Sequence, residues 1–413
     1  MPNTPMAAPA DPPATPDFID HEWRPLASAV LRGGFVDLAW PDGGTFEAYS
    51  LWLAENAEGF GLEPSVREST LEPIDLPDPR GLLRASVDVD GALRLGWADG
   101  RDVRVHPGWL RHVADDRHLP ASVLPCAVPW TAADLAEPPT IDGSGVLDDG
   151  AVIERWLTRL VRSGICRLEN TPTDTEFVGR LIRSIGPIRD TNFGHVWSVK
   201  ADVDPNSTAN TGLDLGQHTD LPTREVPPGF QFLHCIENTV EGGWSRMSDG
   251  WAVVEEIRRE HPDAHEALST LDWVFMNRAR DAEHCWVGPI IDHGSPHQPL
   301  TLRAFYPVRT APHMPVADVP RAYESLRVFA EVARDPRFQI RYAFRPGDLV
   351  GFDNRRILHG RDAFESGGAR HLRGCYADHD DLYSRLRVLR RPTRASGTAR
   401  QPSPTHPSTE VSA

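Results

Sequence analysis

Lysine is almost absent from this 413-residue chain, because Lys200 is the only lysine in it. Arginine supplies nearly all the positive charge, and the formal net charge is -16. Binding to nucleic acid phosphates needs clustered Lys and Arg side chains that release counterions, and no basic run is present. These features argue against a nucleic acid partner and favour a small-molecule ligand. They also exclude most covalent chemistry that uses a lysine amine.

Cysteine is scarce, and its five positions are scattered without a C-x-x-C pair. An odd number of isolated cysteines argues against both a disulfide framework and a zinc knuckle. The residues are Cys126, Cys166, Cys235, Cys285 and Cys375.

Long apolar runs are also missing, and none approaches the roughly 20 residues that a membrane-spanning helix requires. The opening "MPNTPMAAPADPPATPD" has neither the basic start nor the apolar core of a secretion signal. We therefore expect no membrane partner, a cytoplasmic location and a disordered tail over residues 1–16. The low-complexity residues 391–413 are expected to form a second disordered tail.

A tandem pattern marks the first third of the chain. Trp40 and Trp97 each begin a W-x-D-G motif twelve residues before a Trp-Leu pair. Asp-Gly after a short apolar strand indicates a hairpin turn, so one supersecondary unit is predicted to occur twice. We assign residues 17–116 to a small β-rich N-terminal domain, and the proline-rich residues 117–148 to a linker.

Residues 149–390 have a different pattern of apolar residues. Apolar residues at helical spacing predict helices over 149–164 and near 174–186, with the strand "ICRLEN" between them. From about residue 190 the chain consists mostly of short β-branched or aromatic runs, which one helix near residues 321–335 interrupts. The fold class predicted is mainly β with flanking helices (α+β), with a β-sandwich or jelly roll as its second domain.

"GQHTDLP" places His218 and Asp220 two residues apart, where both can reach one ion if the segment is extended. Taken alone, the pair could equally be a hydrogen-bonded polar turn. A third ligand is expected from His359 in "GDLVGFDNRRILHGRDAF", at the end of an apolar strand. Two histidines and one carboxylate form the facial set that leaves positions on iron(II) open, whereas structural zinc takes four protein ligands.

Arg370 follows His359 by eleven residues, across a segment that contains Gly-Gly. We predict that "ILHGRD" and "RHLRGCY" pair as an antiparallel hairpin. The planar guanidinium of Arg370 could then hold a carboxylate beside the metal. A 2-oxo acid has the chemistry for such a site, because one end chelates the metal and the far carboxylate meets the arginine.

Four long segments resemble a known family: "HTDLP", "PPGFQFLHCIENTVEGGWSRMSDGW", "RPGDLVGFDNRRILHGRDAFE" and "RHLRGCYADHDDLYSRLRVLR". They are similar to the gamma-butyrobetaine hydroxylase and trimethyllysine hydroxylase group of iron(II), 2-oxoglutarate-dependent dioxygenases, in the TauD/TfdA superfamily. The resemblance implies a double-stranded β-helix (jelly-roll) core over residues 149–390. It also implies Fe(II) on His218, Asp220 and His359, with 2-oxoglutarate on Arg370 and O2 as the oxidant. Asp220 argues against halogenation, and association as a homodimer is expected by analogy.

The chain departs from this family in its N-terminal domain. Members carry a zinc ion there on three cysteines and a histidine, but "LWLAENAEGFGLEP" has no cysteine and Arg101 stands at the histidine position. We therefore predict no structural zinc.

The substrate pocket also differs. By position, Phe193, Trp197 and Tyr376 match three walls of the aromatic cage that surrounds a trimethylammonium group, while Asn210 replaces a tyrosine. Tyr306 and Pro307 stand where the family has an Asn-Asn pair that helps to hold the substrate carboxylate. We expect a small metabolite of amine, betaine or amino-acid type other than gamma-butyrobetaine, with Arg303 or Arg309 available to an anionic or polar end.

The predicted function is hydroxylation of an unactivated C–H bond by an Fe(II)- and 2-oxoglutarate-dependent dioxygenase. The same cofactor chemistry could instead give desaturation, cyclisation or C–C cleavage, and the sequence does not separate these outcomes. A binding protein without catalysis would not need the complete set of His218, Asp220, His359 and Arg370. A zinc-dependent jelly-roll hydrolase or lyase would not need Arg370.

Overall fold

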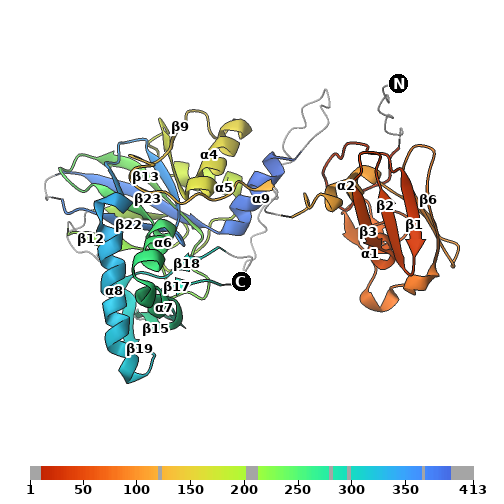
Figure 1. Ribbon diagram of the computed structural model, residues 1–413. Coiled ribbons are helices and arrows are strands. Elements are labelled where there is room, and N and C mark those ends of the chain that lie inside the picture. The colour runs from red at the N-terminus through yellow and green to blue at the C-terminus, as the bar shows by residue number, and fades with distance from the viewer. Residues whose placement is uncertain are drawn as a thin grey trace, which may run out of the picture. The chain divides into compact units, whose positions relative to one another are not determined.

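The computed structural model describes residues 11–119, 123–200, 213–278, 282–294, 299–364 and 368–391. The chain divides into two compact units, of which one comprises residues 1–123 with 390–413 and the other residues 124–389 (Figure 1). Most of the two predicted tails lies outside the described residues, although Thr15 is described and is buried. Within the described ranges, no helix is long and apolar enough to cross a membrane.

The N-terminal unit contains two three-stranded antiparallel sheets, each followed by a short helix. The first sheet joins β1, β2 and β3, and the second joins β6, β7 and β8. Their bounds are β1 Ser28–Arg32, β2 Phe35–Ala39, β3 Thr45–Tyr49, α1 Ser50–Glu55, β6 Leu82–Val87, β7 Leu93–Trp97, β8 Asp102–Val105 and α2 Pro107–Ala114. A minor pair, β4 Leu62–Glu63 and β5 Glu68–Ser69, lies between them in the chain.

The tandem sequence motif corresponds to this duplicated arrangement. The motif glycines Gly43 and Gly100 sit in the turns before β3 and β8, with φ angles of +88° and +89°. Only glycine adopts such angles without steric cost, which explains why the turn sequence recurs. The second tryptophans of the two motifs, Trp52 and Trp109, stack with ring centroids 5.0 Å apart. The two copies of the motif therefore contribute side chains to one hydrophobic core.

Arg101, at the position of the family histidine, lies with its guanidinium 3.4 Å from the centre of the Phe60 ring. A guanidinium has no lone pair to offer a metal ion, and a phenyl ring has none either. These two residues do not fit a zinc site. The absence of zinc itself stays a prediction.

The second unit is built around a six-stranded sheet of order β11-β23-β13-β21-β10-β9 and a four-stranded sheet of order β12-β22-β14-β20. The strands of the six-stranded sheet are β9 Thr140–Asp142, β10 Ile165–Glu169, β11 Trp197–Lys200, β13 Phe230–Asn238, β21 Leu349–Asp353 and β23 Arg370–Ala377. Those of the four-stranded sheet are β12 Leu215–His218, β14 Ser245–Asp249, β20 Gln339–Tyr342 and β22 Ile357–Arg361. One apolar cluster joins the two, for example through Cys235 and Phe352 from the larger sheet and Met247 and Tyr342 from the smaller. The sheets therefore pack face to face.

Helices cover the outer faces of both sheets. α4 Gly150–Ser163, α5 Phe177–Ile185 and α9 His379–Leu389 share a buried apolar cluster with the six-stranded sheet. Figure 1 shows these helices beside the strands of that sheet. α6 Gly250–Glu260, α7 Pro262–Thr270 and α8 Val319–Arg334 form a second cluster, which Leu358 of β22 joins. The predicted class of mainly strands with flanking helices is confirmed. Five further strands lie outside these two sheets: β15 Trp273–Arg278, β16 Glu283–Gly288, β17 Ile291–Asp292, β18 Thr301–Leu302 and β19 Arg309–Pro312.

Local sequence signals set the limits of α4. Its N-cap Asp149 accepts a hydrogen bond from the Ala151 N–H, and Gly164 ends the helix at φ 72°. The buried side chains recur at helical spacing, as the sequence predicted. Only one helix was expected beyond residue 190, however, and α6, α7 and α9 correct that expectation. In α7 and α9 charged residues interrupt the apolar positions, so the periodicity is weak even though one face is buried. In α6, where no helix was expected, buried residues do lie at helical spacing, namely Val253, Val254 and Ile257.

Most of the predicted linker belongs to the second unit. Trp130 is 3% exposed, its backbone N–H donates to Asp249 over 3.0 Å, and its indole N–H donates to the Ser163 carbonyl over 2.6 Å. β9 adds to the edge of the six-stranded sheet beside β10. The proline-rich segment is extended, as its composition suggests, but it is bound to the domain rather than spanning a gap.

A buried ion pair between Arg356 and Asp249 contacts the proline-rich segment. Arg356 and Asp249 are 1% and 0% exposed, with Nε–Oδ1 and Nη2–Oδ2 distances of 3.0 and 2.6 Å. Arg356 also donates to the carbonyls of Val128 and Arg162. The guanidinium is therefore surrounded by acceptors, which offsets the cost of removing it from water.

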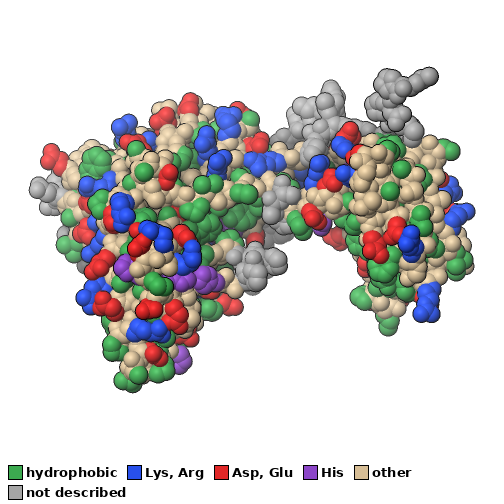
Figure 2. Space-filling model, in the orientation of Figure 1, with side chains coloured by type: hydrophobic (Ala, Val, Ile, Leu, Met, Phe, Trp, Pro, Cys, Tyr) green, Lys and Arg blue, Asp and Glu red, His purple; other side chains and the backbone are tan. Residues whose placement is uncertain are grey.

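On the molecular face drawn in Figure 2, Lys and Arg side chains lie among Asp and Glu side chains rather than apart from them. The net negative charge is thus not gathered into one patch on this face.

Replacing Arg356 with alanine should destabilise the second unit by about 3–5 kcal/mol, because Asp249 would keep a buried charge without its partner. Chemical denaturation followed by tryptophan fluorescence measures the change. Arg258→Ala provides the control, since Arg258 forms an exposed pair with Glu255 and should cost less than about 1 kcal/mol. Equal effects of the two substitutions would contradict the role given to the buried pair.

Candidate metal centre

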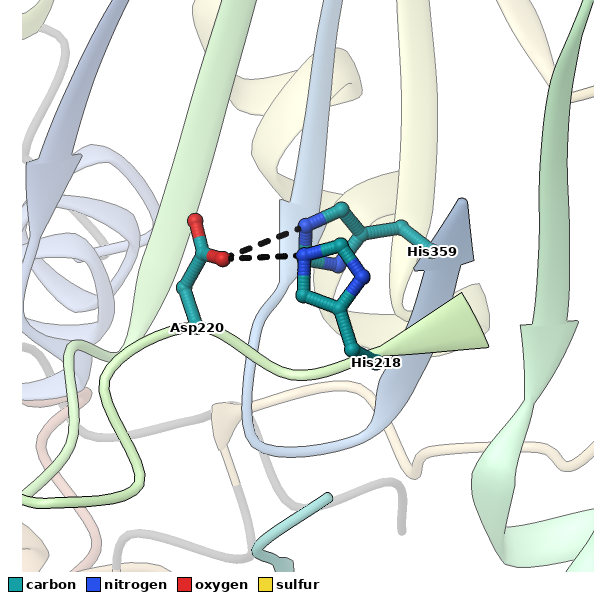
Figure 3. Close-up of side chains that lie close together, drawn as sticks. All are labelled: His218, Asp220 and His359. Atoms are coloured by element: carbon teal, nitrogen blue, oxygen red, sulfur yellow. Dashed lines mark ion pairs between the residues drawn. The ribbon is translucent and has the colours of Figure 1, made fainter. Parts of the chain in front are cut away.

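His218, Asp220 and His359 come together where the edge strand β12 and its neighbour β22 of the smaller sheet meet the loop that follows β12 (Figure 3). His218 is the last residue of β12 and lies directly opposite His359 of β22 in the antiparallel ladder. Asp220 follows in the loop after β12. Its Oδ1 is 3.2 Å from His218 Nε2 and 3.6 Å from His359 Nε2. In the part of the chain described, these residues form the one group of three whose ligand atoms converge on a single point.

The spacing fits a bound metal ion. With metal–ligand bonds of roughly 2.1 Å, two ligand atoms lie about 3 Å apart at right angles and about 3.4 Å apart at tetrahedral angles, and the two observed distances are close to these values. The Nδ1–H of His218 donates to the Gly216 carbonyl over 2.8 Å. This bond leaves the lone pair on Nε2, the atom that faces Asp220. The three donor groups match the predicted facial set.

Electrostatics favours the protonation states that a metal ion requires. Burial alone would raise the pKa of Asp220, but the neighbouring His359 and His218 outweigh it and hold that pKa well below its usual value. Burial, followed by the charge of His218, lowers the pKa of His359. An anionic carboxylate beside a neutral imidazole is the state that binds a divalent cation.

Asp220 is held from both its backbone and its side chain. Asn354 accepts from the Asp220 N–H over 2.7 Å and donates to the Asp220 carbonyl over 3.0 Å. The Tyr376 hydroxyl donates to Oδ2 over 2.7 Å. Burial and the nearby carboxylate raise the pKa of Tyr376, so it remains a donor. Oδ1 is left as the oxygen that faces the two histidines.

Arg370 begins β23 in the six-stranded sheet, whereas His359 lies on β22 in the four-stranded sheet. The predicted hairpin between these segments is therefore wrong. After β22 the chain leaves the four-stranded sheet, and β23 enters the six-stranded sheet. In both sheets most neighbouring strands are distant in the sequence. Arg370 approaches from the opposite layer instead of from an adjacent strand.

Arg370 is 7% exposed, and its side chain makes no hydrogen bond or ion pair within the described residues. Its guanidinium lies 5.8 Å from the centre of the Phe364 ring, which also faces Arg361 at 4.6 Å. Arg361 lies two residues beyond His359, on the same face of β22. Burial, followed by the charge of Arg370, lowers the pKa of Arg361 to about 10. Arg361 also donates to the Leu213 carbonyl over 2.9 Å, whereas Arg370 has no acidic partner in the described residues. A buried guanidinium such as that of Arg370 attracts an anion.

Two of the predicted cage residues lie together beside the metal ligands. Trp197 of β11 and Tyr376 of β23 have ring centroids 5.4 Å apart, and Tyr376 is the residue bonded to Asp220. Phe193 is 48% exposed in the preceding loop. Tyr306 is partly buried within a short 3-10 helix, with Arg309 over its ring at 5.5 Å. Asn210 lies outside the described residues.

Arg303 has a different setting from the one predicted. It is 2% exposed, and it donates to the backbone carbonyls of Pro222, Arg224 and Glu225. Its guanidinium also faces Trp286 at 4.5 Å. Because its hydrogen bonds go to the loop that follows Asp220, Arg303 supports the geometry of that loop. Its Nε also lies 3.7 Å from Asp292 Oδ2. A role of Arg303 in binding the substrate stays a prediction.

Sequence reasoning assigned no role at the metal centre to Phe305 or Phe364. The Phe305 ring centroid is 4.8 Å from that of His218, and Phe364 separates the two arginines. Isolated phenylalanines in loops carry no periodic signal, so these contacts had to come from the tertiary structure. Asn354 lies five residues before His359, and its side-chain amide holds the backbone of Asp220 through two hydrogen bonds.

The comparisons with known proteins agree with this site. Residues 124–376 match the family described as "Taurine catabolism dioxygenase TauD, TfdA family". The chain belongs to this dioxygenase family, which confirms the predicted family and enzyme class. The His–Asp–His group accords with the predicted use of iron(II) and 2-oxoglutarate.

Relatives extend the match over nearly the whole chain. A gamma-butyrobetaine dioxygenase of Pseudomonas sp. (strain AK-1) is 35% identical over 89% of this chain and 97% of its own length. The mitochondrial trimethyllysine dioxygenase of Rattus norvegicus is 28% identical over 90% of this chain and 86% of its own. Among solved structures, a taurine dioxygenase from Burkholderia xenovorans is 15% identical, with a TM-score of 0.45 over 62% of this chain and 89% of that one.

Replacing Tyr376 with phenylalanine removes the hydroxyl that holds Asp220 Oδ2. Outer partners of this kind change metal affinity by roughly 10–100-fold, so we expect divalent metal binding to the apoprotein to weaken by about tenfold. Calorimetric titration with Mn(II) measures it. Tyr323→Phe, on the exposed side of α8, should bind the metal as the unaltered protein does. Unchanged affinity in Tyr376→Phe would show that the Tyr376–Asp220 hydrogen bond is not needed to position the carboxylate.

Proposed function

We propose that this protein is an Fe(II)- and 2-oxoglutarate-dependent dioxygenase that hydroxylates a small cationic metabolite. His218, Asp220 and His359 would hold the iron, and Arg370 would bind the far carboxylate of 2-oxoglutarate. In this proposal the two facing sheets are the halves of a double-stranded β-helix. The observation that carries it is the convergent His–Asp–His group in the same unit as a buried arginine that has no acidic partner within the described residues.

When bound, iron with 2-oxoglutarate and O2 supplies an oxidant able to attack an unactivated C–H bond. The residues of the chain hold and orient the reactants. Three protein ligands on one side leave the other positions for a chelating 2-oxo acid and for O2. Arg370 would fix the orientation of the cosubstrate by a bidentate contact. Asn354 and Tyr376 would keep Asp220 in the geometry that binds through one oxygen.

The aromatic pair supports a cationic substrate. The faces of the Trp197 and Tyr376 rings can attract an ammonium group by roughly 0.5–2 kcal/mol each, depending on desolvation. Tyr376 also contacts Asp220, so a cation held on this pair would lie close to the metal. The named substrates of the two relatives, gamma-butyrobetaine and trimethyllysine, both carry a trimethylammonium group.

We infer that the preferred substrate differs from gamma-butyrobetaine at its other end. Tyr306 and Pro307 form part of a short 3-10 helix at the positions where the family has its Asn-Asn pair. Neither side chain offers the amide donors that would bind a substrate carboxylate. The Tyr306 hydroxyl can donate one hydrogen bond, and Arg309 lies over its ring at 5.5 Å. A substrate whose polar or anionic end differs in shape from that of gamma-butyrobetaine fits these residues better.

Anaerobic addition of Fe(II) and 2-oxoglutarate should produce a visible metal-to-ligand charge-transfer band. The intensity of this band measures 2-oxoglutarate binding. Arg370→Leu should weaken that binding by about 100-fold, because removing one partner of a buried charged contact costs roughly 2–5 kcal/mol of binding free energy. The control is Arg327→Leu, an exposed residue of α8. A folded protein without the band, or a band that persists in Asp220→Ala/His359→Ala, would exclude the proposed site.

A panel of quaternary amines, betaines and amino acids should identify compounds that stimulate succinate release. We expect at least one quaternary or protonated amine to stimulate turnover more than gamma-butyrobetaine does. Trp197→Leu should raise the KM for that amine several-fold, because it removes one cation–π face. The reverse ranking, with gamma-butyrobetaine best, would contradict the inference drawn from Tyr306 and Pro307.

A further inference from the structure

Gln231 on β13 has a buried side-chain amide whose oxygen, Oε1, lacks a hydrogen-bond partner within the described residues. The residue is only 3% exposed. An amide oxygen removed from water without a partner costs roughly 1–3 kcal/mol. Such atoms are few in native proteins, and each calls for a physical reason.

The strand register shows which way Gln231 points. Its partner on β23 is Tyr376, and its partner on β21 is Phe352. Directly opposed residues in antiparallel strands project from the same face of the sheet. Tyr376 contacts Asp220, and the Phe352 ring centroid is 4.7 Å from that of His359. Gln231 therefore projects from the inner face, between two side chains that each touch a metal ligand.

We propose that the Gln231 amide hydrogen-bonds an oxygen-bearing ligand at the open side of the metal. This inference rests on the proposed function. The amide can donate to a carboxylate oxygen of the 2-oxo acid, or it can accept from a water molecule, since it carries both kinds of group. Its apolar neighbour Phe352 cannot form either bond. Gln231 thus adds a polar contact from the six-stranded sheet, opposite the ligands on the smaller sheet.

The variant Gln231→Leu tests whether the Gln231 amide binds a ligand or the side chain only fills space in the core. Leucine has a similar volume and removes a buried, unpartnered amide, so apoprotein stability should be unchanged or higher. If the partner is the cosubstrate, anaerobic titration of the charge-transfer band should show 2-oxoglutarate bound roughly 10–100-fold more weakly, as expected for a lost hydrogen bond to a charged group. If the partner is water, the visible spectrum of the Co(II) protein without 2-oxoglutarate should change instead.

Gln339→Leu is the matched control. The Gln339 amide donates within the protein, to Gln217 and to the Ala333 carbonyl, both over 3.0 Å. Its loss should lower the unfolding temperature while leaving 2-oxoglutarate affinity and the Co(II) spectrum unaltered. Gln231→Met serves as a second variant of the same position, in case leucine is not accommodated.

The outcomes distinguish this inference from the proposed function. A charge-transfer band in the unaltered protein, together with unchanged 2-oxoglutarate affinity and Co(II) spectrum in both Gln231 variants, would overturn the role of Gln231 alone. Failure of the unaltered protein to give the band would overturn the proposed function and this inference with it. Weaker 2-oxoglutarate binding or an altered Co(II) spectrum, without loss of stability, would support the inference.

Discussion

Face-to-face packing of the two sheets is the constraint on which the site depends. The apolar layer between them draws on both sheets, with Val350 and Leu372 on one side and Met247 and Ile340 on the other. Burial of this layer provides the main driving force for bringing the sheets together. Once they are packed, side chains from strands far apart in the chain face a common interior. His218 and His359 come from one layer and Arg370, Tyr376 and Gln231 from the other.

Polar groups inside such a layer are tolerated only when they are satisfied. Asp249 and Arg356 satisfy each other, and Arg303 meets three carbonyls. At the candidate metal centre, several buried polar groups lack such partners. Asp220 is anionic beside two histidines, Arg370 has no acidic partner in the described residues, and the Gln231 oxygen has no donor there. Buried polar atoms without a partner also occur elsewhere in the described residues, for example on Trp97 and Asn238. Those of this site face the position where the proposed iron and cosubstrate would supply charges and hydrogen bonds, and a site organised in advance in this way loses less entropy on binding.

Asp220 also links substrate recognition to metal binding in the proposed enzyme. Tyr376 would form one wall around the substrate cation while its hydroxyl holds Oδ2 of the metal ligand. A substrate that moves the tyrosine ring would therefore move the carboxylate. Asn354 fixes the backbone of the same residue, so only the side-chain torsions of Asp220 would remain free to respond.

The class of fold, the duplicated N-terminal motif and the helix α4 could be predicted from local periodicity and turn chemistry, which the chain displays directly. The three side chains that converge at the candidate metal centre could be predicted from motifs that resemble a known family. The positions of β22 and β23 in opposite sheets, the hydrogen bonds of Arg303 to the loop after Asp220, and the packing of the proline-rich segment after residue 123 into the second unit became visible in the tertiary structure alone. The reason is physical. Strand partners in this fold are chosen by long-range packing of apolar faces, and a sequence pattern records which face is apolar without recording which strand it will meet.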